Sequence, residues 1–381
     1  MEKMEKTPEA RAWLEIDLDI VRDNFRKIRE AAPGMSVRAV IKADAYGLGA
    51  RRTGEVLKES GADGFCVACF QEAKALLPLG LPIQILGTVF DFELPEAVAS
   101  GVILPITGID AAERISAEAV KQNTTAECHL KIDTGMGRMG ILAEHAADVI
   151  REAAKLPGIR ITGIYSHFPN ALPDPDSSAF SARQIARFAR TVRTCQKAGL
   201  DLPLIHVANS DAFLNYPETR TEPYTGIRVG LALWGETDRA ETGIQLRNAV
   251  SFRARLASFR VLPAGSSVGY NRTCRLTRDT LTGTVSAGYA DGLPLALSNK
   301  GEFLFHGKRC RILGRISMDY TVIDLSGFIT DDLTFGEPVT CFGTDRQECI
   351  TAGDWGRIAG THAYNVLTGI GPRVLRVYKG E

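Results

Sequence analysis

The chain has 381 residues, of which 45% are hydrophobic and 24% are charged, a balance typical of a globular protein rather than a disordered one. Its 45 Lys and Arg residues equal its 45 Asp and Glu residues, so no excess positive charge exists to drive nucleic-acid binding. No apolar run approaches the roughly 20 residues that span a bilayer, and the charged N-terminal residues form no secretory signal. We therefore expect a soluble, cytoplasmic protein without nucleic-acid or membrane partners.

The first two-thirds of the chain alternates apolar, strand-like runs with segments of helical spacing. Near-continuous apolar strands separated by helices predict a parallel sheet. Eight such units within about 230 residues favour a closed (β/α)₈ barrel of the TIM type. An open doubly wound sheet is the alternative, although no Gly-rich phosphate turn follows the first run. The eight runs are 37–43, 64–68, 82–87, 102–106, 127–133, 159–168, 202–210 and 226–235.

The pattern changes near residue 245, where short β-branched runs are interrupted by Gly, Pro and Asp. These features predict a mostly-β second domain with one helical segment at residues 351–369. We therefore divide the chain into an N-terminal extension (residues 1–12), a barrel domain (13–240) and a mostly-β C-terminal domain (241–381).

The cysteines provide little functional information. Eight cysteines in a chain of this length are too few for a disulfide scaffold. Cys66 and Cys69 have the CxxC spacing of a redox or metal site, but no second pair accompanies them. Because the run GFCVACF is typical of a buried strand, we interpret them as structural cysteines and predict no metal site.

Polar residues stand where the predicted strands end, and in a barrel these ends form the functional face. Lys42 ends the first run, where burial lowers the pKa of an amine and favours a Schiff-base or general-base role. The alternative is a surface lysine whose amine extends into solvent. Later run ends carry Lys131, Asp133 and the loop with Arg138, then His167, then Asn209 and Ser210, then Arg228.

Each of these residues has a structural explanation when taken singly, such as a helix N-cap at Asn209 or a buried ion pair at Arg228. Together, five of the eight strand ends present mostly cations or hydrogen-bond donors, which favours a planar, anionic ligand with a phosphate. Hydroxyls of Tyr46 and Ser210 would contact the phosphate. Gly230 has no Cβ and would let it approach the backbone closely.

Eight motifs follow one another between about residue 12 and residue 378: IKADAYG, LKIDTGMGRMG, GIYSHF, HVANS, IRVGLALWG, VGYNRT, AGYADG and GRISMD. In this order they resemble the alanine racemase family, whose members are barrel-type enzymes that use pyridoxal 5'-phosphate. The resemblance implies a homodimer with shared active sites that interconverts L- and D-alanine by a two-base mechanism. It further implies that the D-alanine supplies peptidoglycan.

The resemblance also implies individual roles. Lys42 would hold the cofactor covalently and act as one base, and Tyr270 of the partner subunit would act as the second base. Arg228 would face the pyridine nitrogen, while His167 would lie against the cofactor ring and hydrogen-bond Arg228. The remaining implied roles are cofactor binding by Tyr46, Asn209, Ser210, Gly230 and Leu231, substrate binding by Arg138 and Met318, an entrance corridor at Tyr289, and carbamylation of Lys131.

Pro372 stands where many members of that family have a tyrosine that touches the phosphate and crowds the substrate side chain. A proline opens space there, so serine or a broad set of amino acids is an alternative substrate. A decarboxylase with a similar barrel and a non-enzymatic binding protein for the same cofactor are more distant alternatives. Tyr270 after a VG pair, together with GRISMD, favours the racemase, and the second domain argues against the binding protein.

Overall fold

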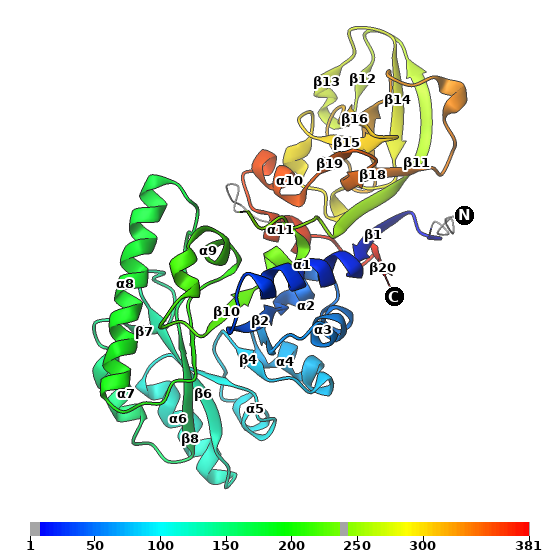
Figure 1. Ribbon diagram of the computed structural model, residues 1–381. Helices are drawn as coiled ribbons and strands as arrows, with labels where there is room; N and C mark the ends of the chain where they lie inside the picture. Colours follow the sequence, from blue (N-terminus) through cyan, green and yellow to red (C-terminus); the bar gives the residue numbers. More distant parts are fainter. Residues whose placement is uncertain (1–7, 237–242, 381) are drawn as a thin grey trace.

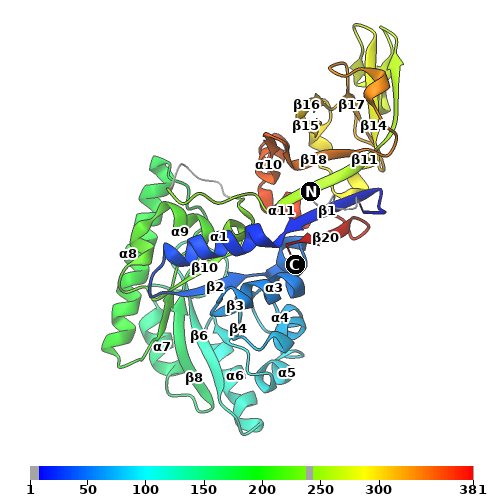
Figure 2. The ribbon, with the colours of Figure 1, turned by 45° about the vertical axis from the view of Figure 1, so that its right-hand side comes forward.

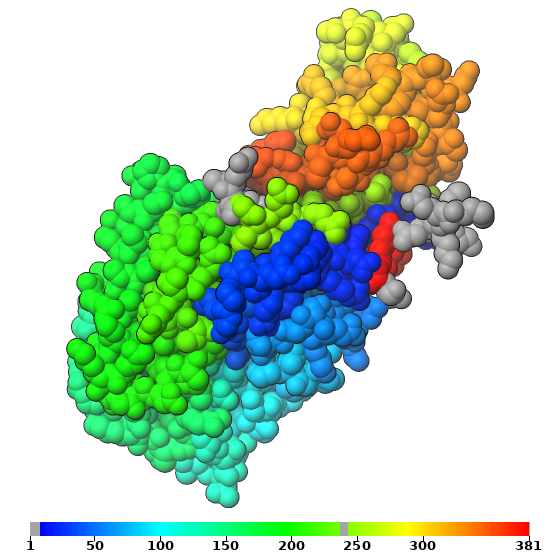
Figure 3. Space-filling model, in the orientation of Figure 1, coloured from blue at the N-terminus to red at the C-terminus, as the bar shows by residue number. Residues whose placement is uncertain are grey.

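The computed structural model describes residues 8–236 and 243–380, which form two lobes. In Figure 1 the barrel occupies the lower left and a mostly-β lobe lies at the upper right. Figure 3 shows the blue N-terminal segment beside the red C-terminal segment, with yellow-green residues next to them, where the two lobes meet.

Eight parallel strands among the described residues pair in the order β4-β3-β2-β10-β9-β8-β6-β5. The two end strands also meet, because the N–H of Ile85 donates to the carbonyl of Ile103 (3.0 Å) and the N–H of Ile103 donates to that of Ile83 (2.8 Å). These bonds close the sheet and confirm the predicted barrel. The strands are β2 (Ser36–Val40), β3 (Gly64–Val67), β4 (Ile83–Ile85), β5 (Leu104–Ile106), β6 (Ala126–Asp133), β8 (Ile159–Tyr165), β9 (Leu204–His206) and β10 (Gly226–Val229).

Each predicted run overlaps one of these strands, and the helices between them surround the barrel. In the part of the chain that the structure describes, no α-helix of this ring follows β10. Helix α1, which precedes β2 and contacts α3, lies instead beside the short turn Leu231–Trp234 (Figure 2). The helices of this lobe are α1 (Leu18–Glu30), α2 (Lys42–Gly47), α3 (Ala50–Glu59), α4 (Phe70–Leu76), α5 (Leu94–Ala99), α6 (Ile109–Lys121), α7 (Ala146–Ala153), α8 (Pro175–Lys197) and α9 (Ser210–Asn215), with the short strand β7 (Ile141–Leu142) beside β6.

The second lobe contains a mostly antiparallel sheet in the order β16-β15-β18-β11-β1-β20, with β14 attached to β11, β17 to β14 and β19 to β18. The predicted helical segment at 351–369 forms two helices. The strands and helices are β1 (Ala12–Asp17), β11 (Val250–Leu262), β12 (Ser267–Val268), β13 (Cys274–Arg275), β14 (Thr280–Val285), β15 (Glu302–Phe305), β16 (Lys308–Arg311), β17 (Thr321–Asp324), β18 (Pro338–Asp345), β19 (Glu348–Ile350), β20 (Leu375–Lys379), α10 (Ala352–Ala359) and α11 (Ala363–Thr368).

The position of strand β1 differs from the predicted domain division. That division assigned residues 13–17 to the barrel domain. It pairs antiparallel with β11 and parallel with β20, so both ends of the chain enter the second sheet. Hydrogen bonds between strands more than 200 residues apart leave no local pattern in the sequence, which explains the difference. The predicted boundary between residues 240 and 241, and residues 1–7 of the predicted extension, lie outside the described residues.

An aromatic cluster forms the core of the second lobe. The ring of Trp355, on α10, lies 5.1 Å from that of Phe342 and 6.0 Å from that of Phe303, measured between centroids. All three side chains are fully buried. The cluster therefore fixes α10 against the sheet, and α11 follows α10 directly.

We expect Trp355→Ala to lower the free energy of unfolding by about 3–5 kcal/mol, because it leaves a large cavity in this core. Urea unfolding followed by circular dichroism measures the change. The control is Phe335→Ala, since Phe335 is 76% exposed and its loss should change stability by less than about 0.5 kcal/mol. Equal effects of the two substitutions would contradict this assignment of the core.

Candidate functional site

A cavity of about 700 Å³ opens at the carboxyl ends of the barrel strands. Its wall combines residues that follow β2, β4, β6, β8, β9 and β10 with residues of α11 and of the loop before it. The position is the one expected for function in a barrel. All eight residues predicted to bind the cofactor line it: Lys42, Tyr46, His167, Asn209, Ser210, Arg228, Gly230 and Leu231.

Lys42 follows strand β2 and begins a turn with left-handed backbone. Residues 43–46 have φ between +51° and +62°, a conformation that costs about 1–2 kcal/mol per L residue. The carboxylate of Glu72 supports the turn by accepting from the N–H of Ala43 at 2.8 Å. The turn brings Lys42 and Tyr46 into the same cavity.

Arg228 is buried at the cavity wall. Its Nη1 donates to Nδ1 of His206 at 2.8 Å, and its Nη2 donates to the carbonyl of Ser166 at 2.7 Å. Because arginine has no acceptor, His206 must carry its proton on Nε2, which donates to Nδ1 of His129 at 3.3 Å. Burial lowers the pKa of both histidines well below its usual value, and Arg228 acts in the same direction, so both rings are neutral.

The predicted hydrogen bond between His167 and Arg228 is wrong, because Arg228 forms this bond with His206. His167 lines the cavity instead. Burial lowers its pKa to about 3, and the charges of Arg228 and Lys42 contribute in the same direction. His167 is therefore a neutral imidazole that faces the site.

Lys131 is buried next to the cavity rather than in its wall. Its Nζ donates to the carbonyl of Leu86, a lining residue, at 2.8 Å and lies 5.2 Å from the ring centre of Tyr165. Burial, together with the nearby charges of Arg228 and Arg138, lowers the pKa of Lys131 to about 7. A large fraction of Lys131 is therefore unprotonated near neutral pH.

Arg138 lies on an exposed, glycine-rich loop after β6. The buried carboxylate of Asp133 anchors this loop by accepting from the N–H of Gly135 (2.8 Å) and of Gly137 (2.9 Å). Burial lowers the pKa of Lys42, and the charge of Arg138 acts in the same direction. The charges of Arg138 and Arg228, which both act on Lys42, favour an anionic ligand.

The three predicted site residues of the second lobe do not line this cavity within the same chain. They are instead exposed, with fractions of 67% for Tyr270, 41% for Tyr289 and 52% for Met318. Large side chains exposed together on loops are available to another surface. One chain therefore does not bring its own Tyr270 into the wall around Lys42.

Sequence reasoning missed several lining residues. Tyr364, on α11, has its ring centre 5.9 Å from that of Tyr46, and its position more than 300 residues later left no signal. His206, the last residue of β9 and the first of the HVANS motif, does not line the cavity but orients Arg228 from behind the wall. The other missed lining residues include Leu86, Met136, Asp211, His362 and Thr368.

The described residues add three observations about other kinds of site. All eight cysteines have free thiols, and Cys66 is buried while Cys69 is half-buried at the start of α4. Within residues 8–236 and 243–380, no three His, Cys, Asp or Glu side chains lie close enough together to hold a metal ion. No helix in these ranges is long and apolar enough to cross a membrane.

Comparisons with known proteins cover both lobes. Residues 16–238 match the family model for the N-terminal domain of alanine racemase, and residues 249–378 match that for its C-terminal domain. The alanine racemase of Clostridium tetani is 32% identical over 373 residues, which cover 96% of this chain and 95% of that protein. The alanine racemase of Synechocystis is 34% identical and covers 96% of this chain and 98% of that protein.

Solved structures are similar over the whole chain. The alanine racemase of Streptomyces lavendulae superimposes with a TM-score of 0.90 and 34% identity, over 99% of this chain and 98% of that one. The enzyme of Bartonella henselae, described with covalently bound pyridoxal phosphate, has a TM-score of 0.86 and 27% identity. It covers 97% of this chain and 100% of its own.

The buried neutral histidines predict a pH dependence of stability. Below about pH 6.5 the unfolded chain binds protons at His129, His167 and His206 that the folded chain excludes. The free energy of unfolding should therefore fall as the pH is lowered from about 6.5 to 5, by up to about 1.4 kcal/mol per pH unit for each histidine. Urea unfolding at a fixed protein concentration measures this slope.

His129→Asn should flatten that slope, whereas His145→Gln should leave it unchanged because His145 is exposed. Carboxylates titrate mostly below this window. An identical slope in His129→Asn and in the unchanged protein would contradict a neutral, buried His129.

Proposed function

Because the chain belongs to the alanine racemase family, we propose that it interconverts L- and D-alanine with pyridoxal phosphate as its cofactor. The observation that carries the proposal is the convergence of Lys42 and the other seven predicted cofactor residues on one cavity. The supply of D-alanine for peptidoglycan is part of the proposal and follows from the family alone.

The contact between Gly230 and Tyr46 supports a phosphate site. A Cβ at Gly230 would lie 2.1 Å from the hydroxyl oxygen of Tyr46, so only glycine lets this hydroxyl lie against the backbone beside the space that a phosphate would occupy. Burial raises the pKa of Tyr46, which keeps its hydroxyl protonated and able to donate. The hydroxyl of Ser210 accepts from the N–H of Gly230 at 3.0 Å, which fixes the backbone beside this space.

Arg228 would face the ring nitrogen of the cofactor. It offers only donors, and no carboxylate among the described residues forms an ion pair with it. Its orientation depends on neutral His206, which accepts one of its hydrogen bonds. When bound, pyridoxal phosphate would supply a conjugated ring over which the electron pair left by the α-proton can spread.

The chain itself would move the protons. Burial lowers the pKa of Lys42, so its amine is more readily unprotonated and able to hold the α-proton on one face of the substrate. On the opposite face, Tyr270 of the partner subunit would act as the second base. The exposure of Tyr270 supports this assignment, since a tyrosine that completes a partner's site must be accessible in the single chain.

Arg138 and Met318 of the partner subunit would bind the substrate carboxylate, and Tyr289 of the partner subunit would line the entrance. Lys131 has a pKa of about 7, and its neutral amine is the form that reacts with carbon dioxide. We include carbamylation of Lys131 in the proposal, because it converts a cation into an anion that would pair with Arg138. Pro372 is exposed and is absent from the described cavity wall, so alanine is the substrate we propose.

We expect purified protein to exchange the α-proton of L-alanine for deuterium in heavy water and to form D-alanine faster than D-serine from L-serine. Lys42→Ala and Tyr270→Phe should each lower the rate by about 10²- to 10⁴-fold, because each removes one proton-transfer group. Chiral chromatography and mass spectrometry measure both products.

Mixed dimers of these two variants should regain activity, since one of their two sites has both bases. If D-serine forms as fast as D-alanine, the proposed substrate is a broader class of amino acids rather than alanine alone. Release of carbon dioxide without racemisation would favour the decarboxylase.

We expect Gly230→Ala to weaken pyridoxal phosphate binding by about tenfold or more, because the new methyl group displaces the Tyr46 hydroxyl. Titration of the cofactor absorbance in the cofactor-free protein measures the dissociation constant. Gly327→Ala is the matched control, since a Cβ at Gly327 meets no atom within 4 Å. Unchanged affinity in Gly230→Ala would mean that the phosphate binds elsewhere in the cavity.

A further inference from the structure

Two loops of the second lobe carry residues that the proposed function assigns to the partner's site. Tyr289 lies in the loop 288–291, and Met318 lies in the loop 317–320. The loops are hydrogen-bonded to each other, because the N–H of Tyr289 donates to the carbonyl of Ser317 and the N–H of Ala290 donates to that of Met318, each at 3.0 Å. Any displacement of one loop therefore displaces the other.

Backbone packing makes this contact tight. A Cβ at Gly288 would lie 2.3 Å from the carbonyl oxygen of Ser317 and 2.4 Å from that of Met318. The two backbones thus meet without a side chain between them. Their joint position must then be set by groups outside the two loops.

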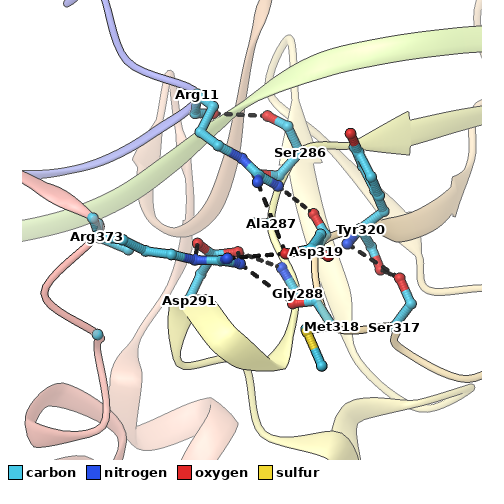
Figure 4. Close-up of polar contacts among 12 residues, drawn as sticks. Arg11, Ser286, Ala287, Gly288, Asp291, Ser317, Met318, Asp319, Tyr320 and Arg373 are labelled. Carbon is cyan, nitrogen blue, oxygen red and sulfur yellow. Dashed lines mark hydrogen bonds and ion pairs between the residues drawn. The ribbon is translucent and has the colours of Figure 1, made fainter.

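Arg373 supplies such a group, and it comes from the segment just before β20 (Figure 4). Its Nε and Nη2 donate to the two carboxylate oxygens of Asp291, at 2.6 and 2.9 Å. Its Nη1 donates to the carboxylate of Asp319 at 2.9 Å, and Nη2 also reaches the carbonyl of Met318 at 3.4 Å. One guanidinium therefore bridges a carboxylate from each loop.

The bridge differs from an ordinary surface ion pair. The side chain of Asp291 is only 1% exposed, so its charge requires a partner that stays in place. Its carboxylate also accepts from the N–H of Gly288 at 2.8 Å, which closes the first loop. The fork of donors on arginine matches two carboxylates at once, which a lysine cannot do.

A second arginine holds the same region from the other end of the chain. Arg11, just before β1, donates from Nη2 to the carbonyl of Ser286 at 3.1 Å and to the backbone carbonyl of Asp319 (Figure 4). Its guanidinium lies 3.9 Å from the Asp319 carboxylate, at the limit of an ion pair. Arg373 is therefore the residue that bridges the two carboxylates most directly.

We propose that Arg373 is a positioning residue that acts in trans: it holds the loops of Tyr289 and Met318 in the geometry that the partner's Lys42 site requires. The inference rests on the proposed function, which places Met318 and Tyr289 at the active site of the partner subunit. Loss of the bridge leaves Asp291 buried without its cation, and the loops move away from the position that binds the substrate carboxylate.

The test is a mixing experiment with Arg373→Gln and Lys42→Ala chains. We expect Arg373→Gln alone to lower kcat/KM for alanine by about tenfold or more, with most of the loss in KM, because substrate binding is impaired. In a mixed dimer, the site with Lys42 receives its loops from the Lys42→Ala chain, whose Arg373 is intact. Random mixing should then restore about a quarter of the activity of the unchanged enzyme, since half of the dimers have one complete site.

A structural role within the same subunit predicts the opposite result. The site with Lys42 would still belong to the chain without Arg373, and mixing would restore nothing beyond the Arg373→Gln level. That outcome overturns the proposal. The parallel mixture of Lys42→Ala and Tyr270→Phe tests the shared sites separately from the role of Arg373. If this mixture regains activity while the Arg373 mixture does not, only the proposed role of Arg373 is wrong. If neither mixture regains activity, shared sites and the role in trans both fail.

Arg309→Gln is the matched control, because Arg309 also bridges two carboxylates of the second lobe, Glu302 and Glu348. It lies outside both loops, so it should leave KM unchanged. Arg373→Lys should lie between Arg373→Gln and the unchanged enzyme, since one ammonium satisfies only one carboxylate well.

Hydrogen exchange gives a measurement independent of activity. Peptides covering residues 286–292 and 315–322 should exchange faster in Arg373→Gln than in Arg309→Gln, because the hydrogen bonds between the loops open more often. Equal exchange in the two variants would mean that Arg373 does not hold these loops and would overturn the proposal.

Discussion

The cavity depends on the left-handed turn that follows Lys42. Four non-glycine residues keep positive φ there, and such strain persists only where neighbouring groups stabilise it. Glu72 supports the turn from α4, and Arg376 supports its end by donating from Nε to the carbonyl of Gly47 at 3.0 Å. Since Arg376 lies on β20, the second sheet braces the turn that brings Lys42 and Tyr46 into the barrel mouth.

The same brace explains why the two lobes work as one unit. Tyr378, also on β20, donates to the carbonyl of Leu48 at 2.9 Å. A Cβ at Gly49 would lie 1.8 Å from the hydroxyl oxygen of Tyr378, so the strand and the turn touch directly. Tyr364 on α11 then adds a wall of the cavity. A barrel without its second lobe would lose both the support of Lys42 and part of the cavity.

The site combines charged side chains, which attract the ligand, with neutral histidines, one of which orients Arg228. The cationic side chains around the cavity favour an anionic ligand, while the histidines beside them stay neutral because burial and Arg228 both oppose protonation. Neutral His206 can accept from Arg228, which a protonated ring cannot do. The orientation of Arg228 therefore depends on a residue that never reaches the cavity wall.

The barrel and several residues of the candidate site could be predicted from the sequence. Apolar runs with helical segments between them predicted the barrel, because strand and helix periodicities are local. Lys42, His167 and Arg228 were found because residues at strand ends of a barrel converge whatever the details of packing. The ordered motifs indicated the family, and both lobes match its models.

Only the tertiary structure decided the contacts between distant segments. The pairing of β1 with β11 and β20, the bond from Arg228 to His206, and the bridge from Arg373 to Asp291 and Asp319 each join residues that no local pattern links. Periodicity records which face of an element is buried, whereas a hydrogen bond depends on where two side chains meet in space. The sequence by itself therefore determined the barrel and the eight predicted residues of the cavity wall. The folded chain determined the rest of that wall and the groups that orient it.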